Sequence, residues 1–206
     1  MKNKLVFGLA LLLLSAPGMT RAEAPHQVGG FALGRNIAEY EDRVIMDTAL
    51  AVRYSENIEE VEIKFTQGFK SGLIAYGTCA KPGHIARIKL KYADSSKEFY
   101  ENLLKRFKKH FGDPDEYRGD PFGIVKAWKW SFVDKHNQRI SLNLEHNAID
   151  SEEKKGNAVK ITNTTLIEED ALCYKRKQLD HRERLRQREW KALNPELTGW
   201  DLFVPR

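Results

Sequence analysis

Cysteine is scarce in this chain of 206 residues, which contains only two, and only one long apolar run is present. Two cysteines form one bridge at most, so a small fold held by several disulfides is excluded. The apolar run, residues 5–14, lies near the N-terminus, so a polytopic membrane protein is also excluded. Repeats and low-complexity tracts are absent. With 41% hydrophobic residues, the chain has enough apolar material for one core.

Motifs for catalysis and metal binding are missing as well. No P-loop, dinucleotide fingerprint or nucleophile elbow occurs, and no two histidines are four residues apart on one predicted helix. The six histidines are scattered at positions 26, 84, 110, 136, 146 and 181. We therefore expect no metal, no cofactor and no enzymatic activity. A hydrolase site assembled only in three dimensions stays open as an alternative.

The first 22 residues have the pattern of a secretory signal peptide. Lys2 and Lys4 precede the apolar run, and Thr20-Arg21-Ala22 fits a small-x-small cleavage site. Ten residues make about 15 Å of helix, half the thickness of a hydrocarbon core, so we expect no transmembrane span after cleavage. The pattern predicts a bacterial protein exported to the periplasm or secreted.

Cleavage would change how the charges and cysteines are interpreted. It removes three bases and no acid, which lowers the net charge from +5 to +2, so nucleic acid is not an expected partner. An oxidising compartment favours a disulfide between Cys79 and Cys173. Two separate buried thiols are the alternative.

Hydrophobic periodicity predicts an α+β fold with one domain over residues 23–166. We expect three strands, a helix and three more strands, in an antiparallel sheet of about six strands wrapped on the helix. The strands are predicted within 61–65, 73–78, 86–92, 122–132, 140–144 and 158–166, the last of them a polar sheet edge. The third strand has a basic outer face.

Two helices are predicted. Ser95 and Glu98 have the spacing of a capping box before an amphipathic helix that ends at Gly112, with Phe99, Leu103, Phe107 and Phe111 on its apolar side. A long charged helix begins at Ile167, and together with a tail it forms a basic C-terminal region over residues 167–206.

Aromatic and acidic residues each form one notable group. Phe122, Trp128, Trp130 and Phe132 share one side of a predicted strand, either as core under the helix or as a stacking platform for a ligand. The loop after Gly112 carries four acids, but their spacing departs from that of an EF-hand, so a rigid turn is favoured over calcium binding. These acids are Asp113, Asp115, Glu116 and Asp120.

Positive charge gathers in the C-terminal helix, where residues 174–191 hold eight bases and three acids. The bases are Lys175, Arg176, Lys177, Arg182, Arg184, Arg186, Arg188 and Lys191. They favour docking to an acidic envelope protein or an anionic envelope surface. A solvated helix packed lightly on the domain is the alternative.

These observations favour an exported, non-enzymatic interaction or envelope-associated protein that uses the basic helix. The second hypothesis is a small-ligand binder, for a sugar or lipid, that uses the aromatic strand and a cavity between sheet and helix.

Overall fold

The computed structural model describes residues 22–53, 55–149, 156–193 and 203–204. The predicted signal peptide therefore lies outside the described residues, except for Ala22. The elements are β1 (Gln27–Val28), β2 (Phe31–Ala32), the 3-10 helix η1 (Ile37–Tyr40), β3 (Val44–Val52), β4 (Ser55–Ile63), β5 (Phe69–Gly77), β6 (Ile85–Tyr92), α1 (Lys97–Phe111), β7 (Glu116–Tyr117), β8 (Val125–Val133), β9 (Arg139–Asn147), β10 (Gly156–Asn163) and α2 (Thr164–Leu193).

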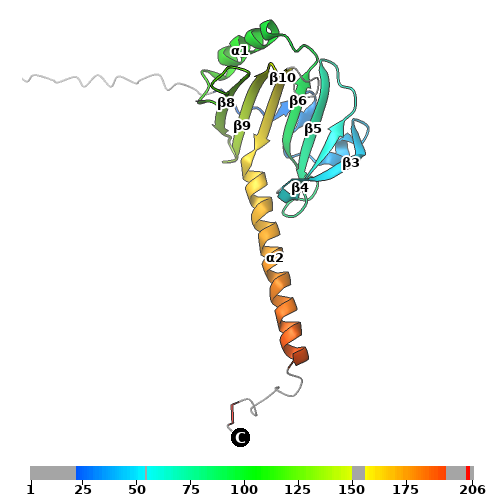
Figure 1. The fold of residues 1–206 in the computed structure, drawn as a ribbon. Coiled ribbons are helices and arrows are strands. Elements are labelled where there is room, and N and C mark those ends of the chain that lie inside the picture. Colours follow the sequence, from blue (N-terminus) through cyan, green and yellow to red (C-terminus); the bar gives the residue numbers. More distant parts are fainter. Residues whose placement is uncertain (1–21, 54, 150–155, 194–202, 205–206) are drawn as a thin grey trace, which may run out of the picture.

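The expected α+β class is confirmed, with a larger sheet than predicted. Eight strands pair in the order β3-β4-β5-β6-β10-β9-β8-β7, every pair antiparallel, and β1 and β2 form a separate hairpin (Figure 1). The order has an internal symmetry: two four-stranded meanders, β3–β6 and β7–β10, meet through their last strands. Each meander is followed by a helix, α1 or α2.

Helix α1 packs on the inner face of the second meander, as its apolar stripe predicts. Phe107 contacts Trp130 with ring centroids 6.0 Å apart, and Phe111 contacts Phe132 at 5.7 Å. The predicted cap is one residue off, because the N-cap is Ser96, whose hydroxyl accepts from the Phe99 N–H at 3.2 Å. Gly112 ends the helix at a positive φ of 81°.

The N-terminal segment covers the inner face of the first meander. Phe31, Leu33 and Ile37 are buried in the same core cluster as the strand residues Ile74 and Ile85. The chain comes close to the sheet here: a Cβ on residue 29, a glycine, would lie 2.4 Å from the Leu90 side chain. The inner layer therefore consists of α1 over one half of the sheet and the N-terminal segment over the other.

The prediction that residues 158–166 form an edge strand is wrong. This strand, β10, ends at Asn163 and lies at the sheet centre, between β6 and β9. Its polar residues are compatible with a central position, because its two buried asparagines have hydrogen-bond partners elsewhere in the protein. Asn157 Nδ2 donates to the carbonyls of Asp94 and Ser96, each at 2.9 Å, and Asn163 Nδ2 donates to Gln138 Oε1 at 2.7 Å.

The outermost strands, β3 and β7, were not predicted from the sequence. β3 has a mostly solvent-exposed burial pattern and an irregular register against β4, and β7 has only two residues. Phe65, predicted within the first strand, lies beyond β4 and is exposed. None of the described helices is long and apolar enough to cross a membrane.

Candidate functional site

Helix α2 begins directly after β10, at the lower end of the sheet as seen in Figure 1. Its first turns are fixed to the body. Leu166 and Asp170 are the buried residues of the helix. Both carboxylate oxygens of Asp170 accept hydrogen bonds: Oδ1 from the N–H groups of Cys79 (2.9 Å) and Ala80 (2.7 Å), and Oδ2 from Thr78 N and Asn57 Nδ2 (3.3 Å each). A glycine at position 77 permits this approach, because a Cβ there would lie 2.7 Å from Asp170 Oδ1.

A disulfide lies one turn further along the helix. Cys79 and Cys173 are bonded, with Cα atoms 5.8 Å apart, which confirms the predicted pairing. Lys81 forms an ion pair with Glu169 at 3.2 Å, and the Tyr174 hydroxyl donates to Glu56. We call this set of contacts, from Leu166 to Tyr174, the α2 base. Its covalent bond and buried carboxylate hold the helix to the loop after β5.

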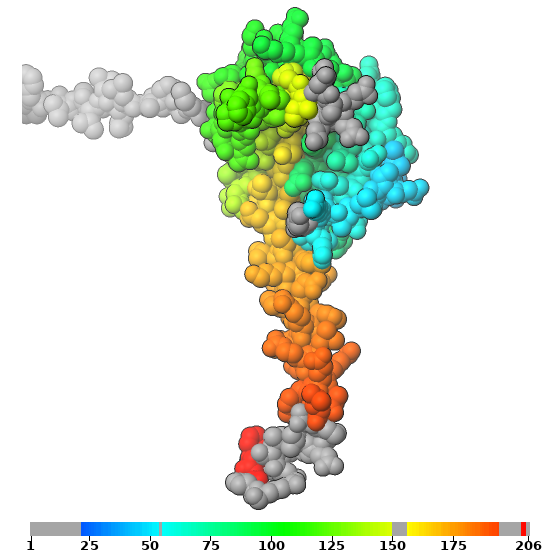
Figure 2. All heavy atoms as spheres, viewed as in Figure 1, coloured from blue at the N-terminus to red at the C-terminus, as the bar shows by residue number. Residues whose placement is uncertain are grey.

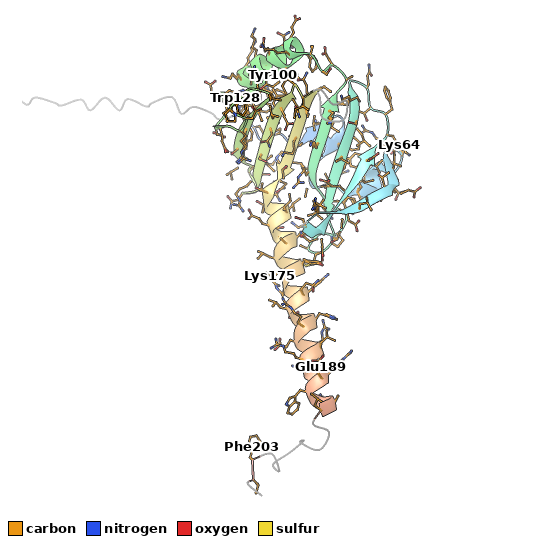
Figure 3. All side chains as sticks on the ribbon, in the orientation of Figure 1. Lys64, Tyr100, Trp128, Lys175, Glu189 and Phe203 are labelled. Atoms are coloured by element: carbon orange, nitrogen blue, oxygen red, sulfur yellow. A yellow bond between two sulfur atoms is a disulfide. The ribbon has the colours of Figure 1, made fainter. Side chains whose placement is uncertain are left out.

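Beyond Tyr174 the helix projects from the body. Figure 2 shows it as a separate rod, and Figure 3 shows Lys175 and Glu189 on the projecting part. All described residues from Lys175 to Leu193 are exposed, so the eight predicted docking bases lie on the accessible part of one continuous helix. These basic residues lie around the helix rather than on one side of it, unlike those of a helix that lies in a membrane interface.

The four predicted platform residues do not form one open surface. Trp130 is 1% exposed and Phe132 is also buried, and both pack against α1. Phe122 lies before β8 and is 86% exposed. Trp128 is half-buried under Tyr117, with ring centroids 4.7 Å apart, beside α1 (Figure 3). Two members of the stripe are therefore core residues, and their rings fill the space between sheet and helix.

The acidic loop uses its carboxylates for internal contacts. Asp115 Oδ2 accepts from the Ser131 N–H at 2.6 Å, and Glu116 pairs with Arg118 at 3.0 Å. The backbone N–H groups of Val125 and Phe122 donate to Asp120 and hold the pKa of that carboxyl below its ordinary value. Within the described parts of the chain, no three His, Cys, Asp or Glu residues are grouped as metal ligands.

The outer face of the sheet, opposite α1, contains a cluster that the sequence did not indicate. Lys89 of β6 lies directly opposite Lys160 of β10. Arg87 and Lys91 lie on the same side of β6 as Lys89. Lys129 of β8 lies in the same row as Lys160, with Asn143 of β9 between them. We call these five basic residues the cationic sheet face. The sequence predicts the basic outer side of β6, but it does not predict the partner strand, because the polar residues of β10 indicate a sheet edge.

At least two of these basic residues have acidic partners. Arg87 pairs with Glu60 at 3.3 Å and Lys129 with Glu116 at 3.6 Å, whereas in the described part of the chain neither Lys89 nor Lys160 forms an ion pair. Burial lowers the pKa of Lys160 below its ordinary value, and the charges of Arg87 and Lys89 lower it further, against a weaker opposing effect of Glu145.

A groove of about 570 Å³ opens beside the cationic sheet face. Three lysines line it together with residues of β4 and β5: Lys70, Lys89, Lys91, Glu62, Ile63, Ser71, Gly72 and Leu73. The groove thus combines three ammonium groups, a hydroxyl, a carboxylate and two apolar side chains, those of Ile63 and Leu73.

Comparison of the chain with protein-family models, with curated proteins and with solved structures finds no match. The function is therefore argued from the residues and the geometry of this chain.

Proposed function

We propose that this is an exported, non-enzymatic interaction protein whose helix α2 docks an acidic partner protein. One observation carries the proposal: a basic helix continues beyond the domain, fully exposed, while its base is fastened by a disulfide and a buried carboxylate. A helix held in this way loses less conformational freedom when it binds than a free tail would.

The charge distribution supports this choice of partner. The segment from Lys175 to Lys191 has a net charge of +5, which attracts acidic surfaces and favours fast association at low salt. Because the bases surround the helix, a partner that encloses it can use most of them, whereas a flat bilayer contacts one side only. An anionic envelope surface is thus the weaker alternative.

The periplasm, or the exterior of the cell, is the proposed location. The signal-like N-terminus supports it, and the Cys79–Cys173 disulfide is compatible with an oxidising compartment. The low net charge of the chain without residues 1–22 is consistent with a local docking element rather than a generally basic protein.

Charge removal on α2 tests the proposal. The variant Arg182→Gln, Arg186→Gln, Arg188→Gln is compared with the matched control Lys105→Gln, Arg106→Gln, Lys109→Gln, which removes three exposed charges from α1. A photo-crosslinker in α2 identifies the partner in the periplasm, and titration with the purified partner gives Kd.

We expect the α2 variant to weaken binding at least about tenfold, with a strong salt dependence, and the α1 control to leave Kd within about twofold. Equal effects of the two variants would refute docking through α2. Binding to vesicles of phosphatidylglycerol, without a crosslinked protein, would support the envelope surface instead.

A further inference from the structure

The cationic sheet face keeps an arrangement that costs stability. Lys89 and Lys160 are direct cross-strand neighbours, with Cβ atoms expected about 5 Å apart, and like charges in such pairs destabilise a sheet. Lys160 lies on a central strand and is half-buried, so its ammonium group also loses part of its hydration. An anion bound between the two ammonium groups would offset both costs.

Two positive charges on directly opposite residues favour a phosphate group. A phosphate monoester carries about two negative charges near neutral pH and three acceptor oxygens, so one such group can accept hydrogen bonds from both ammonium groups. A carboxylate carries only one negative charge. Asn143 and Thr162, which flank Lys160 and Arg87 in the same sheet register, add an amide and a hydroxyl to the same face.

The neighbouring groove indicates what the phosphate is attached to. It shares Lys89 and Lys91 with the cationic sheet face, and its volume of about 570 Å³ is in the range of small-molecule sites. Glu62 can accept hydrogen bonds from hydroxyl groups, Ser71 can donate or accept one, and Leu73 offers an apolar contact. A hydroxyl-rich ring of moderate size matches this lining better than a lipid chain does.

We propose that this face binds a monosaccharide phosphate, whose phosphate bridges Lys89 and Lys160 and whose sugar lies in the groove beside Glu62, Ser71 and Leu73. The site goes beyond the docking function proposed above and uses none of the basic residues of α2. Variants of the two regions therefore separate the two proposals: loss of one activity leaves the other in place.

Calorimetric titration of the chain without residues 1–22 tests the site, with glucose 6-phosphate as the probe. Glucose and inorganic phosphate are titrated in parallel. Lys160→Met and Lys89→Met remove one charge each and keep the aliphatic stem, Lys160→Arg keeps the charge, and Lys105→Met on exposed α1 is the matched control. Circular dichroism verifies that each variant is folded.

We expect saturable binding of glucose 6-phosphate, weakened at least about tenfold by Lys160→Met or Lys89→Met and less than about threefold by Lys160→Arg or the control. Glu62→Gln should weaken glucose 6-phosphate but not inorganic phosphate. The proposal is overturned if glucose 6-phosphate fails to bind at about 10 mM, if glucose binds equally well, or if the Met variants behave like the control. Binding only to phosphatidic acid vesicles would overturn it in favour of a lipid headgroup.

Discussion

Replacement of Asp170 by alanine should loosen α2 and destabilise the whole domain. Asp170 is 2% exposed, and its carboxylate accepts four hydrogen bonds, three of them from the backbone of Thr78, Cys79 and Ala80. The substitution removes the acceptors and leaves the donors behind. The covalent bond one turn away keeps the helix attached, so the effect reflects the non-covalent part of the α2 base alone.

The magnitude follows from the geometry. The bonds to Cys79 and Ala80 are short, at 2.9 and 2.7 Å, and a hydrogen bond to a charged group contributes about 1.5–3 kcal/mol. The two bonds at 3.3 Å are weaker, and water can reach Ala80, which is exposed. We therefore expect a loss of about 3 kcal/mol in the free energy of unfolding.

Urea unfolding followed by tryptophan fluorescence measures this loss, and hydrogen exchange reports opening of α2. Asp180→Ala is the control, because Asp180 is an exposed acid further along the same helix, and it should change stability by less than about 0.5 kcal/mol. If Asp170→Ala were as stable as Asp180→Ala, the buried carboxylate would have no role in fixing the helix and the account of the α2 base would be wrong.

Three further outcomes follow from the structure. Lys160→Met should stabilise the fold, because it removes a charge that burial and neighbouring charges make unfavourable. In wild type the pKa of Lys160 is lowered in the folded state, so the unfolded chain binds more protons than the folded chain does. The gain over wild type should therefore shrink as pH rises towards the ordinary lysine value of 10.5, as unfolding curves across that range can measure. Asn157→Ala should cost about 2–3 kcal/mol in urea unfolding, since it leaves the Asp94 and Ser96 carbonyls without their donor; a neutral result would contradict this. Cys79→Ser should cost about 4 kcal/mol, and a reductant should then leave the variant unaffected while it destabilises wild type.

Much of the fold could be predicted from local patterns. The alternation around Ile88 and the four-residue spacing of the α1 phenylalanines each have one dominant buried side, and burial decided the structure there. The place of β10 could not be found this way. Its asparagines look like edge residues, and only the tertiary structure shows that Asn157 and Asn163 are satisfied by distant partners.

Some of the candidate sites could likewise be predicted from the sequence, and others could not. The basic helix depends on the composition of one segment, and the disulfide was predicted because the chain has only two cysteines and a pattern for export. The pair formed by Lys89 and Lys160 depends on which strands are neighbours and in which register, and the chain separates these residues by a helix and three strands. Burial of Trp130 and Phe132 depended on where α1 crosses the sheet.

The fastening of α2 has a mechanical consequence. From Tyr174 to Leu193 the helix is about 30 Å long, and the contacts of the α2 base described above lie at or before Tyr174. It therefore acts as a lever: a tilt of about 5° at the pivot moves the tip by about 3 Å. A small rearrangement in the loop that holds Asp170 would be amplified at the far end, where a bound molecule could sense the state of the globular part.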